Sequence, residues 1–491
     1  MVLSQPFNIF QRFKAVVDAY GNRDALTTDG FDLDYNALLK RVAGCADMLQ
    51  KHGVGKGEIV ALLLPNGLDF VVVTLATMAI DAILLPLNPR FKSEELHQYL
   101  LMNPPKVVFC PADLRQIIEN MPLKVAIFEN VPDIPSEQFQ TDLQVSDAEA
   151  DIPALYMFSS GSTGKSKRIT RTQRQVLSEY YALERTISLK PTDCILCTIP
   201  LYHAHGFGNT LMAALMTGAR LVILTQEFSP RATIRAMESF EISIYPAVPF
   251  MFKMIVDTRF KTSPKLDKLR LLISAGAKLQ QEVAASFLHS YGKPICQLYG
   301  STETGAVCIN QYFPVEKSSS VGRPLDGMMI SILEDSGRQV MPGQEGEIWI
   351  TSPAMTHQYD GLPEVTNECF VDNRFFAGDL GYLDEQGDLF VTGRKKLMIN
   401  VAGYKVDPLE IEQVLKSHPA IDDAVVIGVA DQQYGELIKA VVVRAAGKQC
   451  DEQELIAYAA SQLTEYKLPK VIEFRNEIPY SPLGKVLRKY L

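Results

Sequence analysis

The sequence lacks a long uninterrupted apolar run. Its longest apolar stretch, residues 70–87, is interrupted by Asp81 and Pro86, whereas a helix that spans a membrane needs about 20 consecutive apolar residues. The first ten residues also lack the basic start and apolar segment of a secretory signal peptide. We therefore expect a buried helix that runs into a strand at 70–87, in a cytoplasmic protein without a membrane span.

Positive charge is in deficit, since 48 Lys and Arg stand against 57 Asp and Glu, for a formal net charge of −9. This balance argues against a protein whose main task is to bind nucleic acid. Cysteine is sparse as well, and the eight scattered residues indicate reduced, buried thiols. Cys194 and Cys197 have the spacing of a redox or zinc pair, but they lie in an apolar run with no second pair nearby, which favours a strand.

What the sequence does contain is a long alternation of strand-length apolar segments with helix-length segments. With 491 residues, 47% of them hydrophobic and 21% charged, the chain is long enough for two to four soluble domains of about 100–200 residues each. Strands that alternate with helices predict a mostly parallel sheet covered on both faces. We expect two amphipathic helices flanking a hairpin at 7–52, strands at 59–64, 83–87, 107–109, 194–199, 220–224, 271–273 and 295–299, and helices at 69–78, 93–102, 208–216, 230–240 and 280–291.

Beyond residue 321 the pattern changes to shorter strands and turns. It predicts an antiparallel β subdomain at about 321–393 with strands at 346–351, 381–384 and 388–392. A compact basic joint, Gly393-Arg394-Lys395-Lys396, follows, and then helices at 408–418 and 452–464 with strands at 424–429 and 438–443. The sequence thus predicts an α/β fold with an N-terminal domain at 1–393, a joint at 394–396 and a small α+β C-terminal domain at 397–491.

One segment is rich in glycine and hydroxyl groups and ends in lysine: Ser159, Ser160, Gly161, Ser162, Thr163, Gly164, Lys165, Ser166 and Lys167. Glycine lets the backbone approach a ligand closely, hydroxyl and amide groups donate to phosphate oxygens, and lysine adds positive charge. The segment fails the Walker A pattern, which requires glycine at position 159. It predicts polyphosphate binding without identifying the class of enzyme, and a flexible surface loop is the alternative.

Three other segments carry candidate site residues. Residues 299–304, Tyr-Gly-Ser-Thr-Glu-Thr, place hydroxyls around Glu303, which suits either a Mg²⁺ ligand beside a polyphosphate or a helix N-cap. Asp379 and Arg394 lie at the ends of short predicted strands, where they either hold a ribose diol or pair with each other. Lys485, in Pro-Leu-Gly-Lys, is either a catalytic cation or a solvated side chain.

Together these motifs carry a family resemblance. The order SSGSTGKSK, YGSTET, GDLG, GRKKLMINVAGYKVDPLEIE and PLGKVLRKYL resembles that of the adenylate-forming superfamily. Its members are acyl- and aryl-CoA ligases, the adenylation domains of nonribosomal peptide synthetases, and beetle luciferase. The resemblance covers nearly the whole chain. It implies that a carboxylate attacks the α-phosphate of ATP to give an acyl-adenylate and pyrophosphate, and that a thiol then displaces AMP.

The resemblance also implies roles for the motif residues. Residues 159–167 would hold the β,γ-phosphates, Thr302 the α-phosphate, and Glu303 a Mg²⁺ ion. Asp379 would accept hydrogen bonds from the ribose, supported by Arg394. The rest of the nucleotide site would comprise Gly276, Ala277, Lys278, Tyr299, Gly300 and Ser301.

A mobile C-terminal domain is a further implication of the resemblance. Lys485 would bridge the substrate carboxylate and the ribose-phosphate oxygen during adenylation. Rotation about Lys396 would then withdraw it and bring in Ala402, Gly403 and Tyr404, along which a pantetheine thiol would enter. Ala402 departs from the serine or glycine common at that position, and so leaves the thiol acceptor open.

One missing residue type restricts which acids the pocket can accept. The segment Pro200–Gly208 holds no acidic residue, whereas family members that activate amino acids keep an aspartate there for the ammonium group. The segment is similar to that of acyl- and aryl-CoA ligases, in which a histidine gates the pocket; His203 is the best match and His205 a second candidate. The expected pocket walls are apolar and aromatic, which suits an aryl or medium-chain acyl acid: Tyr202, His203, Phe207, Gly208, Val248, Pro249, Gly276 and Gly300.

Four hypotheses about activity follow. The leading one is an AMP-forming acyl- or aryl-CoA ligase that uses ATP, Mg²⁺ and coenzyme A, as a monomer or homodimer. A close rival loads the phosphopantetheine of a carrier protein. A phosphotransferase would instead release ADP, and a silent ATP-binding protein would show no turnover.

Overall fold

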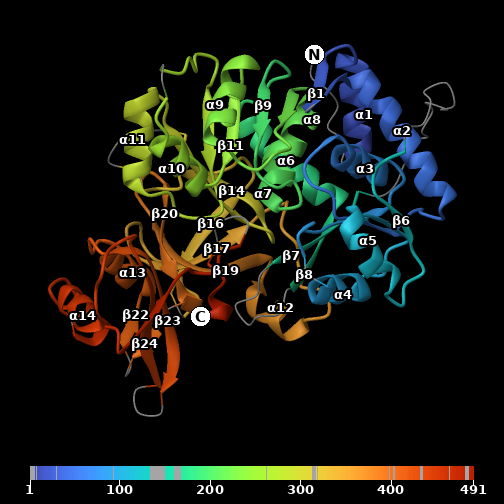
Figure 1. Cartoon of the computed structure of the whole chain (residues 1–491). Helices are drawn as coiled ribbons and strands as arrows, with labels where there is room; N and C mark the ends of the chain where they lie inside the picture. The colour runs from blue at the N-terminus through green and yellow to red at the C-terminus, as the bar shows by residue number, and fades with distance from the viewer. Residues whose placement is uncertain are drawn as a thin grey trace. The chain divides into compact units, whose positions relative to one another are not determined.

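The computed structural model describes residues 6, 8–28, 30–91, 93–132, 150–159, 167–260, 263–311, 317, 319–334, 336–397, 399–401, 404–431, 435–463, 465–481 and 486–491. These residues form two compact units, and Figure 1 shows the course of the chain through its helices and strands. The first contains the described residues up to Ile330 together with Ile350–Phe375, and the second contains those of Ser331–Trp349 and Phe376–Leu491.

The first unit is built on two sheets. The larger has the order β15-β14-β13-β12-β11-β9-β10-β1-β2, and the smaller the order β6-β5-β3-β4-β7-β8. The strands of the larger sheet are β1 (Asp24–Thr28), β2 (Phe31–Asp34), β9 (Cys194–Cys197), β10 (Arg220–Ile223), β11 (Ile244–Ala247), β12 (Leu271–Ser274), β13 (Ile295–Ser301), β14 (Gly305–Ile309) and β15 (Arg323–Pro324). Those of the smaller sheet are β3 (Ile59–Leu62), β4 (Ile83–Pro86), β5 (Val107–Phe109), β6 (Ala126–Phe128), β7 (Pro153–Ser159) and β8 (Lys167–Thr172).

Both sheets are mainly parallel with antiparallel edges. In the larger sheet the six strands from β1 to β13 pair in parallel, and β2, β14 and β15 are antiparallel. In the smaller sheet only the β7–β8 pair is antiparallel. Parallel strands are covered on both faces and hence apolar along their whole length; β9, for example, is buried at all four residues. The predicted α/β fold with mostly parallel sheets is confirmed.

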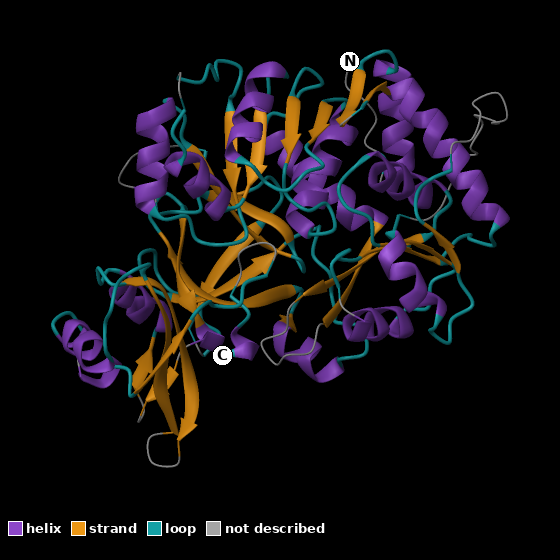
Figure 2. Cartoon of the chain, viewed as in Figure 1, coloured by secondary structure: helices purple, strands orange, loops and turns teal. Residues whose placement is uncertain are grey.

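Helices flank these strands (purple and orange in Figure 2). They are α1 (Ile9–Tyr20), α2 (Tyr35–Lys51), α3 (Leu68–Ala79), α4 (Ser93–Met102), α5 (Ala112–Glu119), α6 (Gln173–Ile187), α7 (Ala204–Gly206), the π-helix η2 (Phe207–Met212), α8 (Ala213–Thr217), α9 (Pro230–Ser239), α10 (Pro249–Asp257), α11 (Gln281–Tyr291) and α12 (Pro363–Cys369). Local chemistry sets several boundaries. Asp34 caps α2 by accepting from Ala37 N, and Thr172 and Gln175 form a capping box at α6.

The apolar stretch 70–87 folds as a buried helix followed by a strand. Every residue of α3 except Asp69 is buried, and β4 follows it. A helix that is apolar all round is buried on all sides, so this prediction is confirmed. Within the described residues, no helix combines the length and apolar character needed to cross a bilayer. All eight cysteines are buried and none forms a disulfide, and Cys194 and Cys197 lie in β9, also as expected.

Several elements of the first unit were not expected from the sequence, among them β8, β11 and α6. Strand β11 contains Pro246, and a proline normally argues against a central strand. Here β11 pairs with β9 only at Ile244, so the missing N–H of Pro246 interrupts no ladder on that side. Strand β8 and helix α6 were also missed, because they follow a glycine- and hydroxyl-rich segment whose composition predicts a loop.

The second unit contains α13 (Pro408–Lys416) and α14 (Glu452–Ala460) on a sheet of the order β22-β21-β24-β23, with β25 (Val471–Arg475) paired to β24. Its strands are β21 (Ile399–Val401), β22 (Tyr404–Val406), β23 (Ile421–Asp431) and β24 (Gly435–Arg444). The core between helices and sheet includes Ile411, Leu415, Val426, Val442 and Leu455. This is the small α+β part predicted for the end of the chain.

A further five-stranded sheet comprises β16 (Met329–Leu333), β17 (Gly346–Thr351), β18 (Phe370–Val371), β19 (Arg374–Leu383) and β20 (Leu389–Arg394). Short 3₁₀ turns lie at Lys395–Leu397, Glu465–Lys467 and Arg488–Tyr490. The segments Ser331–Trp349 and Phe376–Leu491 belong to one unit. The expected pivot at 394–396 stays a prediction.

Candidate active site

The glycine- and hydroxyl-rich segment begins and ends on an antiparallel hairpin. Strand β7 ends at Ser159 and β8 begins at Lys167, and these two residues face each other in the ladder. Residues 160–166 lie outside the described part of the chain. The Lys167 side chain turns inward, is 9% exposed, and places its ammonium 4.4 Å from the centre of the Tyr359 ring. A cation over an aromatic face is stabilised by the ring quadrupole.

The segment 299–304 forms the end of β13 and its turn into β14. Gly300 is required there, because a Cβ would lie 2.2 Å from the carbonyl oxygen of Gly305. In the turn the Glu303 carboxylate is buried, with only 7% of the residue exposed, and its Oε1 accepts a hydrogen bond of 2.8 Å from the Tyr359 hydroxyl. Its carbonyl oxygen accepts from Thr356 N at 2.8 Å. This is a strand-end turn, and the helix N-cap alternative is wrong.

Tyr359 therefore joins two residues that the sequence analysis assigned to separate motifs. Its ring contacts Lys167 and its hydroxyl donates to Glu303. The adjacent Asp360 accepts from Arg168 Nε at 2.9 Å and from Thr170 Oγ1 at 2.5 Å, both on β8. Tyr359 and Asp360 were missed, since nothing in their local sequence marks a site.

Four of the expected nucleotide-site residues lie at the carboxyl ends of neighbouring parallel strands. Gly276, Ala277 and Lys278 follow β12 and are exposed, and Tyr299, near the end of β13, is partly exposed. Open α/β sheets bind ligands outside the carboxyl ends of their strands. These residues are placed where a ligand can reach them.

Asp379 and Arg394 pair with each other in the second unit. They face each other on β19 and β20, with Arg394 Nε 3.0 Å from Asp379 Oδ1. The pair leaves the arginine side chain 42% exposed and that of the aspartate 14%. The structure thus contains the mutual pair, which was one of the two alternatives drawn from the sequence. The other alternative, contact with a ribose diol, stays a prediction.

The two histidines differ in their hydrogen bonding. His205 is held on both sides: its Nε2 lies 3.1 Å from Ala247 O, and Asn209 Nδ2 donates to its Nδ1 at 3.0 Å. His203 Nε2 is buried and makes no hydrogen bond within the described residues. Burial lowers the pKa of both rings to about 4. Both rings are neutral at pH 7. Because His203 Nε2 makes no hydrogen bond within the described residues, it is available to bind a ligand.

The remaining pocket residues follow His203 in the chain or begin the next helix. Tyr202 packs against His203 with ring centres 4.5 Å apart, and burial raises its pKa to about 12. Phe207 and Gly208 open the π-helix η2. Val248 caps α10 and Pro249 is its first residue.

Gly208 faces a feature that the sequence analysis missed. A Cβ at this position would lie 2.7 Å from Oε1 of Glu179, which is bound to Arg171 in a buried ion pair of 2.8 Å. The space beside Gly208 is thus already filled by protein. No local pattern indicates this pair, because Arg171 and Glu179 lie in elements that the sequence did not predict.

Several expected site residues fall outside what the structure describes. These are Ala402, Gly403 and Lys485, together with the side chains of Lys396 and Tyr404. The backbone of Lys396 lies in the 3₁₀ turn Lys395–Leu397, and Tyr404 begins β22. Their assigned roles stay predictions.

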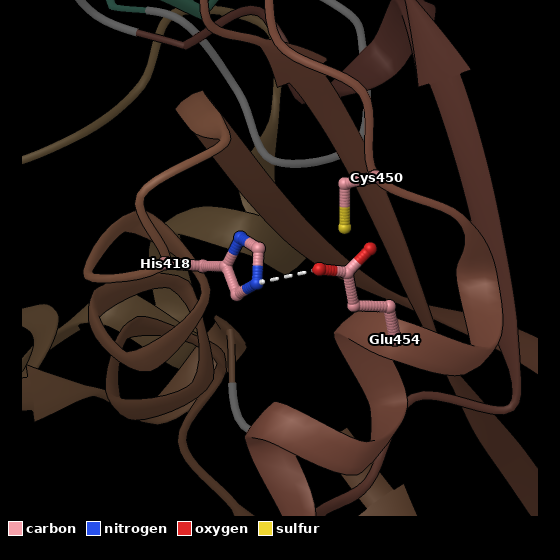
Figure 3. Close-up of side chains that lie close together, drawn as sticks. All are labelled: His418, Cys450 and Glu454. Atoms are coloured by element: carbon pink, nitrogen blue, oxygen red, sulfur yellow. Dashed lines mark ion pairs between the residues drawn. The ribbon is translucent and has the colours of Figure 1, made fainter.

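A group with metal-ligand chemistry lies elsewhere in the second unit. His418, Cys450 and Glu454 each offer an atom within 4.8 Å of the other two (Figure 3). Nitrogen, sulfur and oxygen ligands suit zinc. However, His418 Nδ1 accepts from Ala420 N at 3.2 Å, which places the proton of the neutral ring on Nε2, the atom 3.9 Å from Glu454 Oε1. If a metal bound Nε2, the proton of the neutral ring would move to Nδ1, where it would face the N–H of Ala420. The three side chains are therefore better explained as packing between α13 and α14 than as a metal site.

Comparison with known proteins agrees with this geometry. The AMP-binding enzyme family matches residues 13–360, and the AMP-binding enzyme C-terminal domain matches residues 410–485. A probable CoA ligase of Humulus lupulus is 30% identical, over 97% of this chain and 94% of that protein. A fatty acid–[acyl-carrier-protein] ligase of Streptomyces coeruleorubidus is 29% identical, over 95% and 92%. The crystal structure of ATP-bound MatB from Rhodopseudomonas palustris matches with a TM-score of 0.90 and 26% identity, over 99% of this chain and 98% of that one.

The matched families cover both parts of the chain, and the relatives align over nearly their whole length. The chain therefore belongs to the AMP-binding enzyme family and is an ATP-dependent, adenylate-forming acid–thiol ligase of the acyl- and aryl-CoA synthetase type.

Proposed function

We propose that this ligase activates its acid at the array formed by Lys167, Tyr359 and Glu303. A carboxylate oxygen of the acid attacks the α-phosphorus of ATP, the bond from that phosphorus to the bridging oxygen of the β-phosphate breaks, and pyrophosphate leaves. A thiol sulfur then attacks the acyl carbon, and AMP leaves. The observation that carries this proposal is the cation and the carboxylate held on one tyrosine at the edge of the parallel sheets.

The array can reduce the charge repulsion between the two reactants of the first step. Negative charge meets negative charge when a carboxylate approaches a polyphosphate, and fixed donors and cations placed where charge develops lower that barrier. Lys167 supplies a positive charge at the base of the hairpin, while Thr302 brings a hydroxyl from the adjacent turn to the α-phosphate. Residues 160–166 complete the phosphate site in this proposal.

Glu303 fits a divalent cation better than it fits a phosphate. Its carboxylate is buried and hydrogen-bonded by the neutral Tyr359, and a buried charge is stable only when it is paired. Mg²⁺ prefers one or two carboxylates together with waters and substrate phosphates. When bound, such an ion would neutralise phosphate charge, and Glu303 would hold it.

The second unit contributes residues whose placement relative to the first is part of the proposal. Asp379, oriented by Arg394 at 3.0 Å, accepts hydrogen bonds from the ribose diol. Lys485 donates to the reacting oxygens during adenylation, and rotation about Lys396 then exchanges it for the segment at 402–404. Lys396→Pro should slow passage between the two steps more than adenylation alone; equal overall rates for wild type and variant would remove the pivot from this position.

The acid is a carboxylic acid without an α-ammonium group. Residues 200–208 provide no carboxylate for such a group, and the rings of His203 and His205 are neutral. The neighbouring walls, Tyr202, Phe207 and Val248, are apolar or aromatic. An aryl or acyl acid suits this surface.

Coenzyme A is the proposed thiol. The alternative acceptor is the phosphopantetheine of a carrier protein, and it is supported by the 29% identity to a ligase named for an acyl-carrier protein. Both thiols end in the same pantetheine arm, so the residues that meet the sulfur cannot distinguish them. The distinction lies in what binds the rest of the carrier.

The test is acid-dependent exchange of labelled pyrophosphate into ATP, run over a panel of benzoates and straight-chain acids with and without Mg²⁺. We expect exchange with some of these acids and none with α-amino acids. Thioester formation is then compared for free CoA and a phosphopantetheinylated carrier. Release of ADP, or the absence of exchange with every acid, would contradict the proposal.

A further inference from the structure

A buried ion pair lies next to the proposed acid site and has no part in the adenylation chemistry. Arg171 on β8 and Glu179 on α6 are joined at 2.8 Å from Nη1 to Oε2, and their side chains are only 3% and 5% exposed. Arg171 Nη2 also donates to the carbonyl oxygens of Gln175 and Ala354, at 3.1 and 3.0 Å. The arginine is thereby fixed to three partners, and it fixes the glutamate in turn.

The Glu179 head group fills the space between two other elements. Its Oε1 accepts from Ala306 N on β14 at 3.0 Å. A Cβ at Gly208 on η2 would lie 2.7 Å from Oε1, and a Cβ at Gly305 on β14 would lie 2.6 Å from Cδ. The carboxylate thus occupies the room that side chains at two facing glycines would otherwise take. A π-helix such as η2 frequently marks a functional site.

One of these elements forms a wall of the proposed acid pocket, and the other pairs with a strand that does. Phe207 and Gly208 lie on η2, and Gly300 is paired with Ala306 across β13 and β14. An acid that extended past Gly208 between these walls would meet the Glu179 carboxylate. We propose that the Arg171–Glu179 pair is the closed end of the acid pocket and makes this enzyme specific for short acids.

The chemistry of the pair suits a firm end wall. An apolar wall can often repack around one more methylene, with limited cost. A buried carboxylate bound to a guanidinium and to a backbone N–H cannot move without leaving a charge and a donor unpaired, which is far more costly. The pair should therefore exclude longer chains sharply, as a polar pocket wall does.

The test rests on the proposed function and uses pyrophosphate exchange with straight-chain acids from acetate to decanoate. The double variant Arg171→Met/Glu179→Ala removes both charges together and opens room for about two to three methylene groups. The matched control, Arg171→Met/Glu179→Gln, removes the same charges but keeps the volume and an oxygen that can accept from Ala306 N. Because one methylene changes discrimination by about tenfold or more, the first variant should gain at least tenfold in the ratio of long to short acids, and the control should keep the wild-type order.

Equal chain-length profiles for the two double variants would overturn the proposal, as would a wild-type enzyme that prefers octanoate or decanoate. Thermal melts identify a variant that fails to fold. For that case Glu179→Asp keeps both charges and shortens the side chain by one methylene, and it should shift the preferred acid by one carbon; an unchanged preference would also overturn the proposal. Failure of the proposed function is distinct, because wild type would then show no exchange with any acid.

Discussion

Tyr359→Phe tests the central array with the smallest possible change. The variant keeps the ring that contacts Lys167 at 4.4 Å and removes only the hydroxyl that donates to Glu303 Oε1 at 2.8 Å. Glu303 is 7% exposed, so water cannot readily replace the lost donor. The carboxylate then loses the donor that fixes its orientation.

The size of the effect follows from the kind of bond. A hydrogen bond to a charged group contributes about 1.5–3 kcal/mol, and 1.4 kcal/mol corresponds to a factor of ten, which gives a loss of about 10- to 150-fold in adenylation rate. If Glu303 holds the divalent cation, the loss should be larger at low Mg²⁺ and should partly recover as Mg²⁺ rises. The binding of the acid should change little, since Tyr359 is assigned no part in the acid pocket.

The assay is pyrophosphate exchange at saturating acid, over a range of Mg²⁺ concentrations, for wild type and Tyr359→Phe. Tyr490→Phe, which alters a tyrosine that is 55% exposed, serves as the control and should match wild type. Tyr359→Leu removes the ring as well and should be weaker than the phenylalanine variant, because Lys167 loses its contact. Full activity and an unchanged Mg²⁺ dependence in Tyr359→Phe would refute the role of this tyrosine.

Three further predictions concern other parts of the chain. Lys485→Ala should abolish adenylation yet spare thioester formation from supplied acyl-adenylate, measured as two separate half-reactions; equal losses would contradict domain alternation. Gly300→Ala should destabilise the fold by about 1–3 kcal/mol and reduce adenylation, because its Cβ would lie 2.2 Å from Gly305 O, whereas Gly55→Ala, with no atom within 4 Å, should do neither in a urea melt. His205 has a pKa lowered from 6.5 to about 4 by burial, so the unfolded chain binds its proton first as pH falls, and about 3 kcal/mol of stability should be lost between about pH 6.5 and pH 4. His205→Gln should show a shallower loss of the urea midpoint over that range, and an equal slope would show that His205 is not the titrating group.

The sequence predicted those parts of the candidate site that are encoded locally. Glu303 and Lys167 lie in short strings of glycine and hydroxyl residues at strand ends, where composition alone indicates close backbone approach and phosphate contact. Asp379 and Arg394 were predicted because each lies at the end of a short predicted strand. The alternation of apolar segments likewise predicted the parallel sheets, since the 2-residue and 3.6-residue periods are local properties.

The parts that were missed depend on contacts between distant segments. Tyr359 and Glu303 are 56 residues apart, and Arg168 and Asp360 are 192 apart. Side chains of ordinary composition become site residues only when the fold brings such segments together. Strand β11 was missed for the opposite reason: its proline satisfies a local rule against central strands, while the tertiary pairing on that side has already ended at Ile244.

Two buried carboxylates of the first unit, Glu179 and Glu303, differ in the charge of their partners. The Glu179 carboxylate has its partners within the protein, because Arg171 pairs with one oxygen at 2.8 Å and Ala306 N donates to the other. Glu303 is also buried, but within the described residues its carboxylate accepts a hydrogen bond from the neutral hydroxyl of Tyr359. A buried carboxylate that accepts from a neutral donor suits a cation that binds from outside the protein. We therefore propose that Glu303 holds a cation that binds with the nucleotide, and that Glu179 belongs to the wall that selects the acid.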